Sequence, residues 1–108
     1  MTALDRSVLA LEARHLRTLQ TLLAQHTPQA QVWAYGSRVH GTSHEGSDLD
    51  LVLRHRGDLS SDVPGLQALK AALQASDLPM LVDVHQWSRL PQTFHANIEA
   101  GSVEISSK

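Results

Sequence analysis

The sequence of 108 residues contains no cysteine, no long apolar run and no excess of positive charge. Without cysteine, neither disulfide bonds nor thiolate metal sites are possible. No stretch approaches the roughly 20 apolar residues that a membrane-spanning helix needs, and acidic and arginine residues lie where the apolar part of a secretory signal would begin. These absences predict a cytoplasmic protein with no membrane partner.

The charge balance argues against nucleic acid as a partner. Nine Lys and Arg residues are set against eleven Asp and Glu, which gives a formal net charge of -2 and an isoelectric point near 6.3. Proteins that bind long nucleic acids usually carry clustered Lys and Arg, so we expect no direct binding to nucleic acid. With 42% hydrophobic residues, the chain can bury one core, and we expect a single domain over residues 1–108.

The spacing of apolar residues predicts an α/β (α+β) domain, in which helices flank a small mixed sheet. Leucines at helical spacing predict a first amphipathic helix from about Thr2 to His26. Short apolar runs predict strands at 32–35, 48–53 and 80–85, with an edge strand at 103–105. Further helices are expected after Ser37, over 64–76 and over 93–100. The predicted order is α-β-α-β-α-β-α.

Gly36 and Ser37 directly follow the first predicted strand. Glycine permits a tight turn and a close approach by a ligand, and serine is a common residue at a helix start. Free N–H groups at a helix start attract anions. The pair therefore predicts a site for the phosphates of a nucleoside triphosphate, although such a dipeptide alone also forms ordinary turns.

Asp48 and Asp50 alternate with leucines in the second predicted strand, so both carboxylates should leave the same face. Two carboxylates placed in this way can share a magnesium ion, which prefers hard oxygen ligands. Alone, the pair is also compatible with a solvent-facing strand, a phosphatase or a sugar transferase. Its spacing of ten residues from Gly36-Ser37, with a strand before each part, favours a nucleotide site.

Asp83 is an acid inside the apolar run Met80–His85, where a buried charge without a partner would be costly. We expect it to be the third acid of the metal site. The alternative is a capping or ion-paired acid at the end of a strand.

Together, Gly36-Ser37 and Asp48-x-Asp50 resemble the motif of minimal nucleotidyltransferases (MNT), small members of the polymerase-β-like nucleotidyltransferase superfamily. The resemblance implies that Asp48 and Asp50 bind one or two Mg²⁺ ions, with ATP as the substrate. It also implies that Asp83 helps to bind metal or activates the attacking hydroxyl.

Two further residues, Arg38 and Ser47, lie at positions that resemble the family and are expected, with Gly36 and Ser37, to bind the nucleotide. For Arg38 the alternative is an exposed arginine that only solvates the surface. The seven histidines show no metal-ligand spacing, so we expect them at surface or structural positions. Two aromatic residues, Trp33 and Trp87, are expected in the core or an interface.

The resemblance also implies a partner and an activity. Domains similar to this one pair with helical HEPN-domain toxins, act as their antitoxins and transfer AMP to a toxin tyrosine. The absence of an extra acceptor-binding helical domain, and the wide apolar stripe of the predicted first helix, are compatible with such a partner and with a homo- or hetero-oligomer. Two alternatives stay open: a non-catalytic nucleotide-binding module that neutralises or scaffolds a helical partner by contact, and an antibiotic-type nucleotidyltransferase with a small-molecule acceptor.

Overall fold

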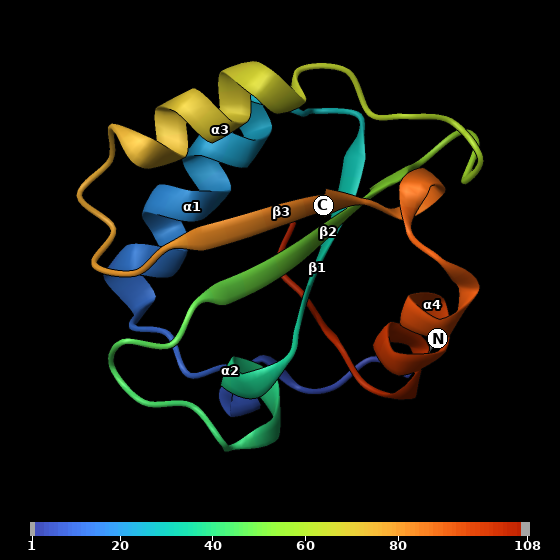
Figure 1. The fold of residues 1–108 in the computed structure, drawn as a ribbon. Helices are drawn as coiled ribbons and strands as arrows, with labels where there is room; N and C mark the ends of the chain where they lie inside the picture. Colours follow the sequence, from blue (N-terminus) through green and yellow to red (C-terminus); the bar gives the residue numbers. More distant parts are fainter. Residues whose placement is uncertain (1, 107–108) are drawn as a thin grey trace.

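The computed structural model describes residues 2–106 and contains a four-stranded mixed sheet with helices on its faces (Figure 1). The strands are β1 (Ala30–Tyr35), β2 (Leu49–His55), β3 (Val82–Gln86) and β4 (Val103–Glu104), in the spatial order β3-β2-β1-β4. β1 is antiparallel to both β2 and β4, whereas β3 is parallel to β2. The helices are η1 (Arg6–Val8), α1 (Ala13–His26), α2 (Ser37–His40), α3 (Leu66–Gln74), η2 (Trp87–Arg89) and α4 (Gln92–Ala100). The predicted fold class and the mixed sheet are confirmed.

Alternation along the strands sends apolar side chains to two separate clusters. Val32, Ala34, Leu49, Leu51 and Leu53 are at most 1% exposed and belong to the main core, which α1 and α3 complete with their own leucines. The opposite face carries a smaller cluster of Trp33, Val52, Trp87 and Ile98, to which η2 and α4 contribute. Figure 1 shows α1 and α3 on one side of the molecule and α4 on the other.

The predicted helix from Thr2 to His26 is wrong in its first half, because α1 begins only at Ala13. The preceding segment runs beside residue 102, where Ala3 forms a parallel bridge with Ser102 and the N–H of Leu4 donates to the Ser102 carbonyl at 2.7 Å. Asp5 then caps the short 3-10 helix η1 by accepting from the N–H of Ser7 at 2.8 Å. These non-local contacts and the local cap outweigh the helical spacing of the leucines.

The other boundaries shift by one or two residues. α3 begins at Leu66 because Gly65 turns the chain with a φ of 93°, and a Cβ there would lie 2.0 Å from the carbonyl oxygen of His26. β3 begins at Val82 rather than Met80. The predicted edge strand is present as β4, and it pairs with β1. Within residues 2–106, no helix combines the length and apolar character that crossing a membrane requires.

Candidate active site

The neighbouring strands β2 and β3 bring the acidic residues together, and β1 adds Tyr35 beside them. In the sheet register, Tyr35 lies opposite Asp50, and Asp50 lies opposite Asp83. Side chains of directly paired residues leave the same face of a sheet, so these three share one face. Asp48 lies two residues before Asp50, directly before β2, so an extended chain sends both side chains to the same face. The expected arrangement is confirmed: the leucines of β2 point into the core and the two aspartates point away from it.

Asp83 joins this face from the outer strand of the sheet. Its side chain is 55% exposed, and its Oδ2 lies 3.1 Å from Nε2 of His85. The argument that Asp83 is a charge buried in an apolar run is therefore wrong, because β3 is the edge strand and only its other face packs into the core. What remains is its position beside Asp50 in the register.

The acidic residues perturb each other electrostatically. Partial burial raises the pKa of Asp50, and the negative charges of Asp83 and Asp48 raise it further, while His85 lowers it. Burial, with Asp50 and Asp83, raises the pKa of Tyr35 to about 12. Tyr35 is therefore a neutral phenol near pH 7. The carboxylates form a concentrated negative centre that a divalent cation would relieve.

Gly36 allows the turn between β1 and α2 to pack directly against this centre. Its φ is 83°, and a Cβ at this position would lie 2.6 Å from Oδ2 of Asp50. Any other residue would therefore strain the backbone and displace the carboxylate. Ser37 opens α2 immediately afterwards, and no side chain caps this helix start within the described residues. The turn between β1 and α2 thus lies against Asp50.

Arg38 organises the loop that leads into Asp48. Its side chain is only 6% exposed, so the alternative of an exposed surface arginine is wrong. The guanidinium donates to the carbonyl oxygens of Ala10 at 2.6 Å, Ser47 at 3.0 Å and Glu45 at 3.1 Å. Ser47 shapes the same loop, because its Oγ accepts from the N–H of His44 at 2.9 Å. Arg38 and Ser47 both hold the backbone that leads into Asp48.

Sequence reasoning missed two residues of this face, Tyr35 and His85. Tyr35 appeared only as the end of an apolar strand, and His85 as one histidine among seven. The available signal was position, since Tyr35 directly precedes Gly36 and His85 lies two residues after Asp83 in an extended strand.

An aromatic cluster covers the other end of the sheet face that carries the acids. Trp33 and Trp87 are 6% and 8% exposed, as expected of core aromatics. His95 of α4 stacks on Trp87 with ring centroids 3.8 Å apart, and the guanidinium carbon of Arg54 lies 4.7 Å from the Trp87 ring centroid. The aromatic cluster therefore anchors η2 and α4 at one end of the face and leaves the acidic end uncovered.

The carboxylates of this face suit magnesium, which shares its ligands with water and substrate, better than a metal that is coordinated by protein side chains alone. Among residues 2–106, no three His, Asp or Glu side chains converge closely enough to enclose an ion. Magnesium usually takes one or two carboxylates and completes its shell with water and substrate phosphates. Asp48 and Asp50, with Asp83 alongside, match that requirement.

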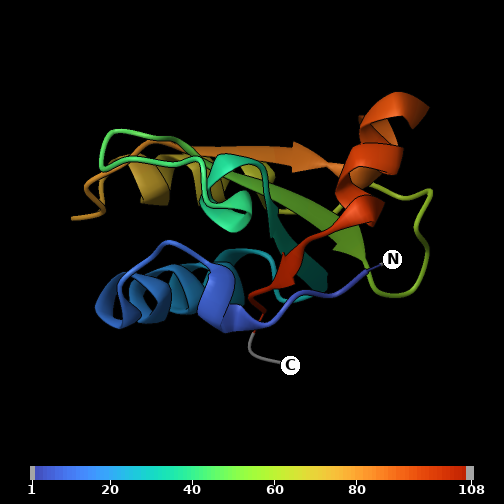
Figure 2. The same ribbon diagram turned by 90° about the horizontal axis from the view of Figure 1, so that it is seen from below.

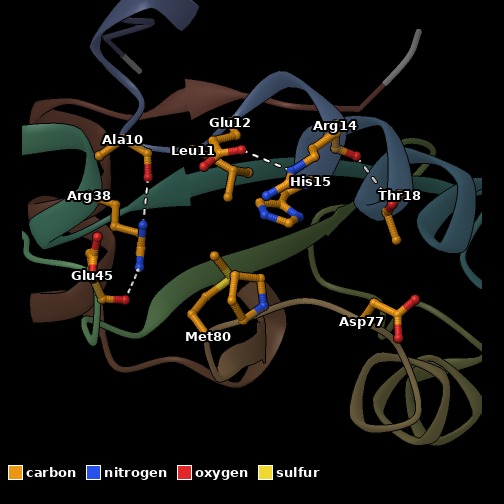
Figure 3. A pocket seen from close by; sticks show the side chains of 11 residues that line it. Ala10, Leu11, Glu12, Arg14, His15, Thr18, Arg38, Glu45, Asp77 and Met80 are labelled. Atoms are coloured by element: carbon orange, nitrogen blue, oxygen red, sulfur yellow. Dashed lines mark hydrogen bonds and ion pairs between the residues drawn. The ribbon is translucent and has the colours of Figure 1, made fainter.

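A large cavity lies beside Arg38 and the start of α1 rather than at the three aspartates. It measures about 800 Å³ and is bounded by the start of α1, Arg38, Glu45 and the segment leading to Met80 (Figure 3). None of Asp48, Asp50 and Asp83 lines it. The carboxylates remain the candidate site, because hard oxygen ligands beside a glycine turn suit a metal and phosphates, whereas cavity size alone indicates no chemistry.

Comparison with known proteins identifies the family. The family model for polymerase beta nucleotidyltransferases matches residues 17–108. A protein of Haemophilus influenzae described as a probable protein adenylyltransferase, MntA, is 36% identical over 100 residues, which cover 93% of this chain and 86% of the relative.

Solved structures agree on the fold. A toxin–antitoxin crystal structure with AMP-PNP superposes with a TM-score of 0.67 at 19% identity, covering 86% of this chain and 73% of the other. A structure of the toxin–antitoxin MntA-HpeT, mutated from aspartate to glutamate at two positions separated by one residue, superposes with a TM-score of 0.66 at 17% identity and the same coverage. At these identities the likeness concerns the fold. With the family match over most of its length, this chain belongs to the polymerase beta nucleotidyltransferase family.

Proposed function

We propose that this chain, taken as one domain, transfers AMP from ATP to a hydroxyl group of a partner protein, with Mg²⁺ as cofactor and pyrophosphate as the second product. The observation that carries the proposal is the register that aligns Asp50 with Asp83, with Gly36 packed against the Asp50 carboxylate. The H. influenzae relative, described as a probable protein adenylyltransferase, supports the reaction type.

Asp48 and Asp50 would hold Mg²⁺, and Asp83 would lie beside them on the neighbouring strand. When bound, this cofactor neutralises phosphate charge and aligns the attacking and leaving oxygens. Gly36 and Ser37 would hold the β- and γ-phosphates, because the uncapped start of α2 lies beside Asp50. Arg38 and Ser47 would contribute to nucleotide binding by fixing the backbone of the loop before Asp48.

The reaction forms a bond between the acceptor oxygen and the α-phosphorus and breaks the bond from that phosphorus to the oxygen bridging to the β-phosphorus. The bonding electrons leave with pyrophosphate. The hydroxyl proton would pass to Asp83, whose exposed carboxylate an incoming acceptor can reach. Tyr35, neutral near pH 7, would add a phenol to the wall of the site without adding charge.

For the partner, we propose a helical HEPN-domain toxin that is modified on a tyrosine, with this chain as the antitoxin. The support is the H. influenzae relative together with the toxin–antitoxin descriptions of two structures with the same fold. One of those structures carries glutamate in place of two aspartates that are separated by one residue, and Asp48 and Asp50 have the same spacing.

The test is transfer of label from α-labelled ATP with Mg²⁺ to proteins in a lysate of the source cells. Wild type is compared with Asp48→Asn, Asp50→Asn and, as a matched control, Asp77→Asn, an exposed acid away from the aligned acids. We expect wild type and the Asp77 variant to label a protein and both site variants to lose at least 100-fold in rate. Binding of a helical partner without any transfer would instead support a non-catalytic module, and label on a small molecule would support the antibiotic-type enzyme.

A further inference from the structure

The three aspartates of the candidate site differ in whether the protein holds their carboxylates. Among residues 2–106, Asp83 is the only one of the three whose carboxylate has a side-chain partner, since Nε2 of His85 lies 3.1 Å from its Oδ2. The carboxylates of Asp48 and Asp50 have no such partner in the described chain and stay available to a cation. One oxygen of Asp83, in contrast, is already engaged.

The hydrogen in this contact belongs to the histidine. An ionised carboxylate only accepts hydrogen bonds, so Nε2 of His85 must carry the hydrogen and donate it to Oδ2 of Asp83. The other oxygen, Oδ1, accepts no hydrogen bond from the part of the chain that the structure describes. The contact therefore occupies one oxygen of the carboxylate and leaves the second free.

The strand fixes the two side chains beside each other. Asp83 and His85 are two residues apart in β3, so both leave the sheet face that carries the acids, with their Cα atoms roughly 6.6 Å apart. In the register, His85 lies opposite Val52, a fully buried member of the aromatic cluster. Figure 2 shows α4 near the end of β3 rather than near its beginning. His85 thus stands between the aromatic cluster and the open acidic end.

No other histidine within residues 2–106 bonds to a carboxylate. The rings of His44 and His55 accept from backbone N–H groups of their own turns at 3.1 Å, and the ring of His95 stacks on Trp87. Those contacts shape local structure. The side chains of His85 and Asp83 are 39% and 55% exposed, and exposed pairs contribute little to stability, so the consequence of this contact should lie in the reaction.

We propose that His85 is a positioning residue for the transfer reaction: its Nε2–H holds Oδ2 of Asp83 and leaves Oδ1 as the oxygen that faces the acceptor hydroxyl. The inference rests on the proposed function, in which the hydroxyl proton passes to Asp83. The proton goes to Oδ1, and the electron pair left on the acceptor oxygen forms the bond to the α-phosphorus. A carboxylate that is already oriented needs no rotation when the acceptor arrives, which speeds the chemical step without tightening substrate binding.

The first test compares His85→Ala with His85→Gln, using the purified protein that wild type labels with α-labelled ATP. Glutamine is the conservative variant, because its amide N–H₂ lies close to where the imidazole Nε2–H was. We expect His85→Ala to lower kcat about tenfold, with the KM for ATP and for the acceptor protein within about twofold, and His85→Gln to restore most of the rate. His26→Ala, at the last residue of α1, is the control and should keep the wild-type rate. An unchanged kcat in His85→Ala, or an equal loss in both His85 variants, would overturn the proposal.

A double-mutant cycle tests whether His85 acts through Asp83. If it does, His85→Ala should change kcat less than about twofold once Asp83 is already alanine, because the group that it positions is gone. The same tenfold loss in both backgrounds would show that His85 acts independently and would refute the positioning role.

Nitrogen NMR of histidine-labelled protein adds a readout that needs no transfer. We expect the ring of His85 to carry hydrogen on Nε2, and its ring signals to change in Asp83→Ala while those of His26 stay the same. Hydrogen on Nδ1 alone, or unchanged signals, would contradict the hydrogen bond and the proposal with it. If wild type labels no protein, the proposed function fails, whereas labelling that His85→Ala leaves unchanged defeats this inference alone.

Discussion

The two faces of the central sheet are built from the same strands but perform different tasks. One face is a continuous apolar layer in which the leucines of β2 pack against α1 and α3. The other is divided into an aromatic cluster under η2 and α4 and an open acidic end with Tyr35, Asp50 and Asp83. Because successive residues alternate between faces, a single strand such as β2 serves both stability and chemistry. Substitutions on the two faces should therefore have separable effects.

The largest effect on stability is expected on the leucine face. Leu51 is fully buried, so Leu51→Ala should lower the free energy of unfolding by about 2–5 kcal/mol through lost packing and the cavity it leaves. Urea unfolding followed by circular dichroism measures the loss. A change below about 1 kcal/mol would show that this face is not a packed core.

Gly36→Ala should lower both stability and transfer activity, and its loss of stability should be smaller than that of Leu51→Ala. The positive φ costs about 1 kcal/mol for a residue with a Cβ, and the new methyl would displace the Asp50 carboxylate. The matched control is Gly41→Ala, since Gly41 has a φ of 77° but no atom within 4 Å of its Cβ position. We expect similar destabilisation in both variants and loss of transfer only in Gly36→Ala. Equal transfer rates would refute the close approach to Asp50.

Asp50→Asn should increase stability while it removes activity. Burial and the neighbouring acids raise the pKa of Asp50, so its protonated form contributes stability at low pH that is lost as the pH rises through the folded pKa. The advantage of Asp50→Asn over wild type should therefore be small near the ordinary value of 3.8 and larger at pH 7. Because the side chain is only partly buried, we expect a gain below about 1 kcal/mol. Thermal melts without Mg²⁺ at both pH values test this, and a destabilised variant at pH 7 would contradict it.

The smallest effect should come from Asp62, remote from the aligned acids. Hydrogen bonds from Arg89 and Ser88 lower the pKa of Asp62, so the stability it contributes is present above its ordinary pKa and is lost as the pH falls through the folded value. Asp62→Asn should melt slightly below wild type at pH 7 and converge with it in acid. Transfer should stay within twofold of wild type. If the difference in melting temperature between Asp62→Asn and wild type grew in acid, the predicted stabilisation by the ionised Asp62 would be contradicted.

The sequence allowed the faces of the β2 side chains to be predicted better than the surroundings of the candidate site. Alternation of leucine with Asp48 and Asp50 is local, so the face of each side chain followed directly from strand geometry. The exposure of Asp83 was mispredicted because it depends on strand order, and no local pattern shows that β3 is an edge strand.

Two other features depended on contacts distant in sequence. The segment before Ala13 is extended because it pairs near Ser102, about a hundred residues away, and helical spacing alone could not reveal that partner. Arg38 looked like a ligand-binding cation, but its guanidinium lies among backbone carbonyls of Ala10 and the loop before Asp48. Such carbonyl partners leave no signature in side-chain patterns, which is why the structural contribution of Arg38 emerged only from the fold.

The most direct test of the central claim is transfer from α-labelled ATP to protein by wild type, Asp48→Asn and Asp50→Asn, with folding of each variant verified by its melting temperature. The account predicts a labelled protein with wild type and at least a 100-fold loss in both folded variants. Full transfer by either variant would contradict the assignment of the acidic face as the active site.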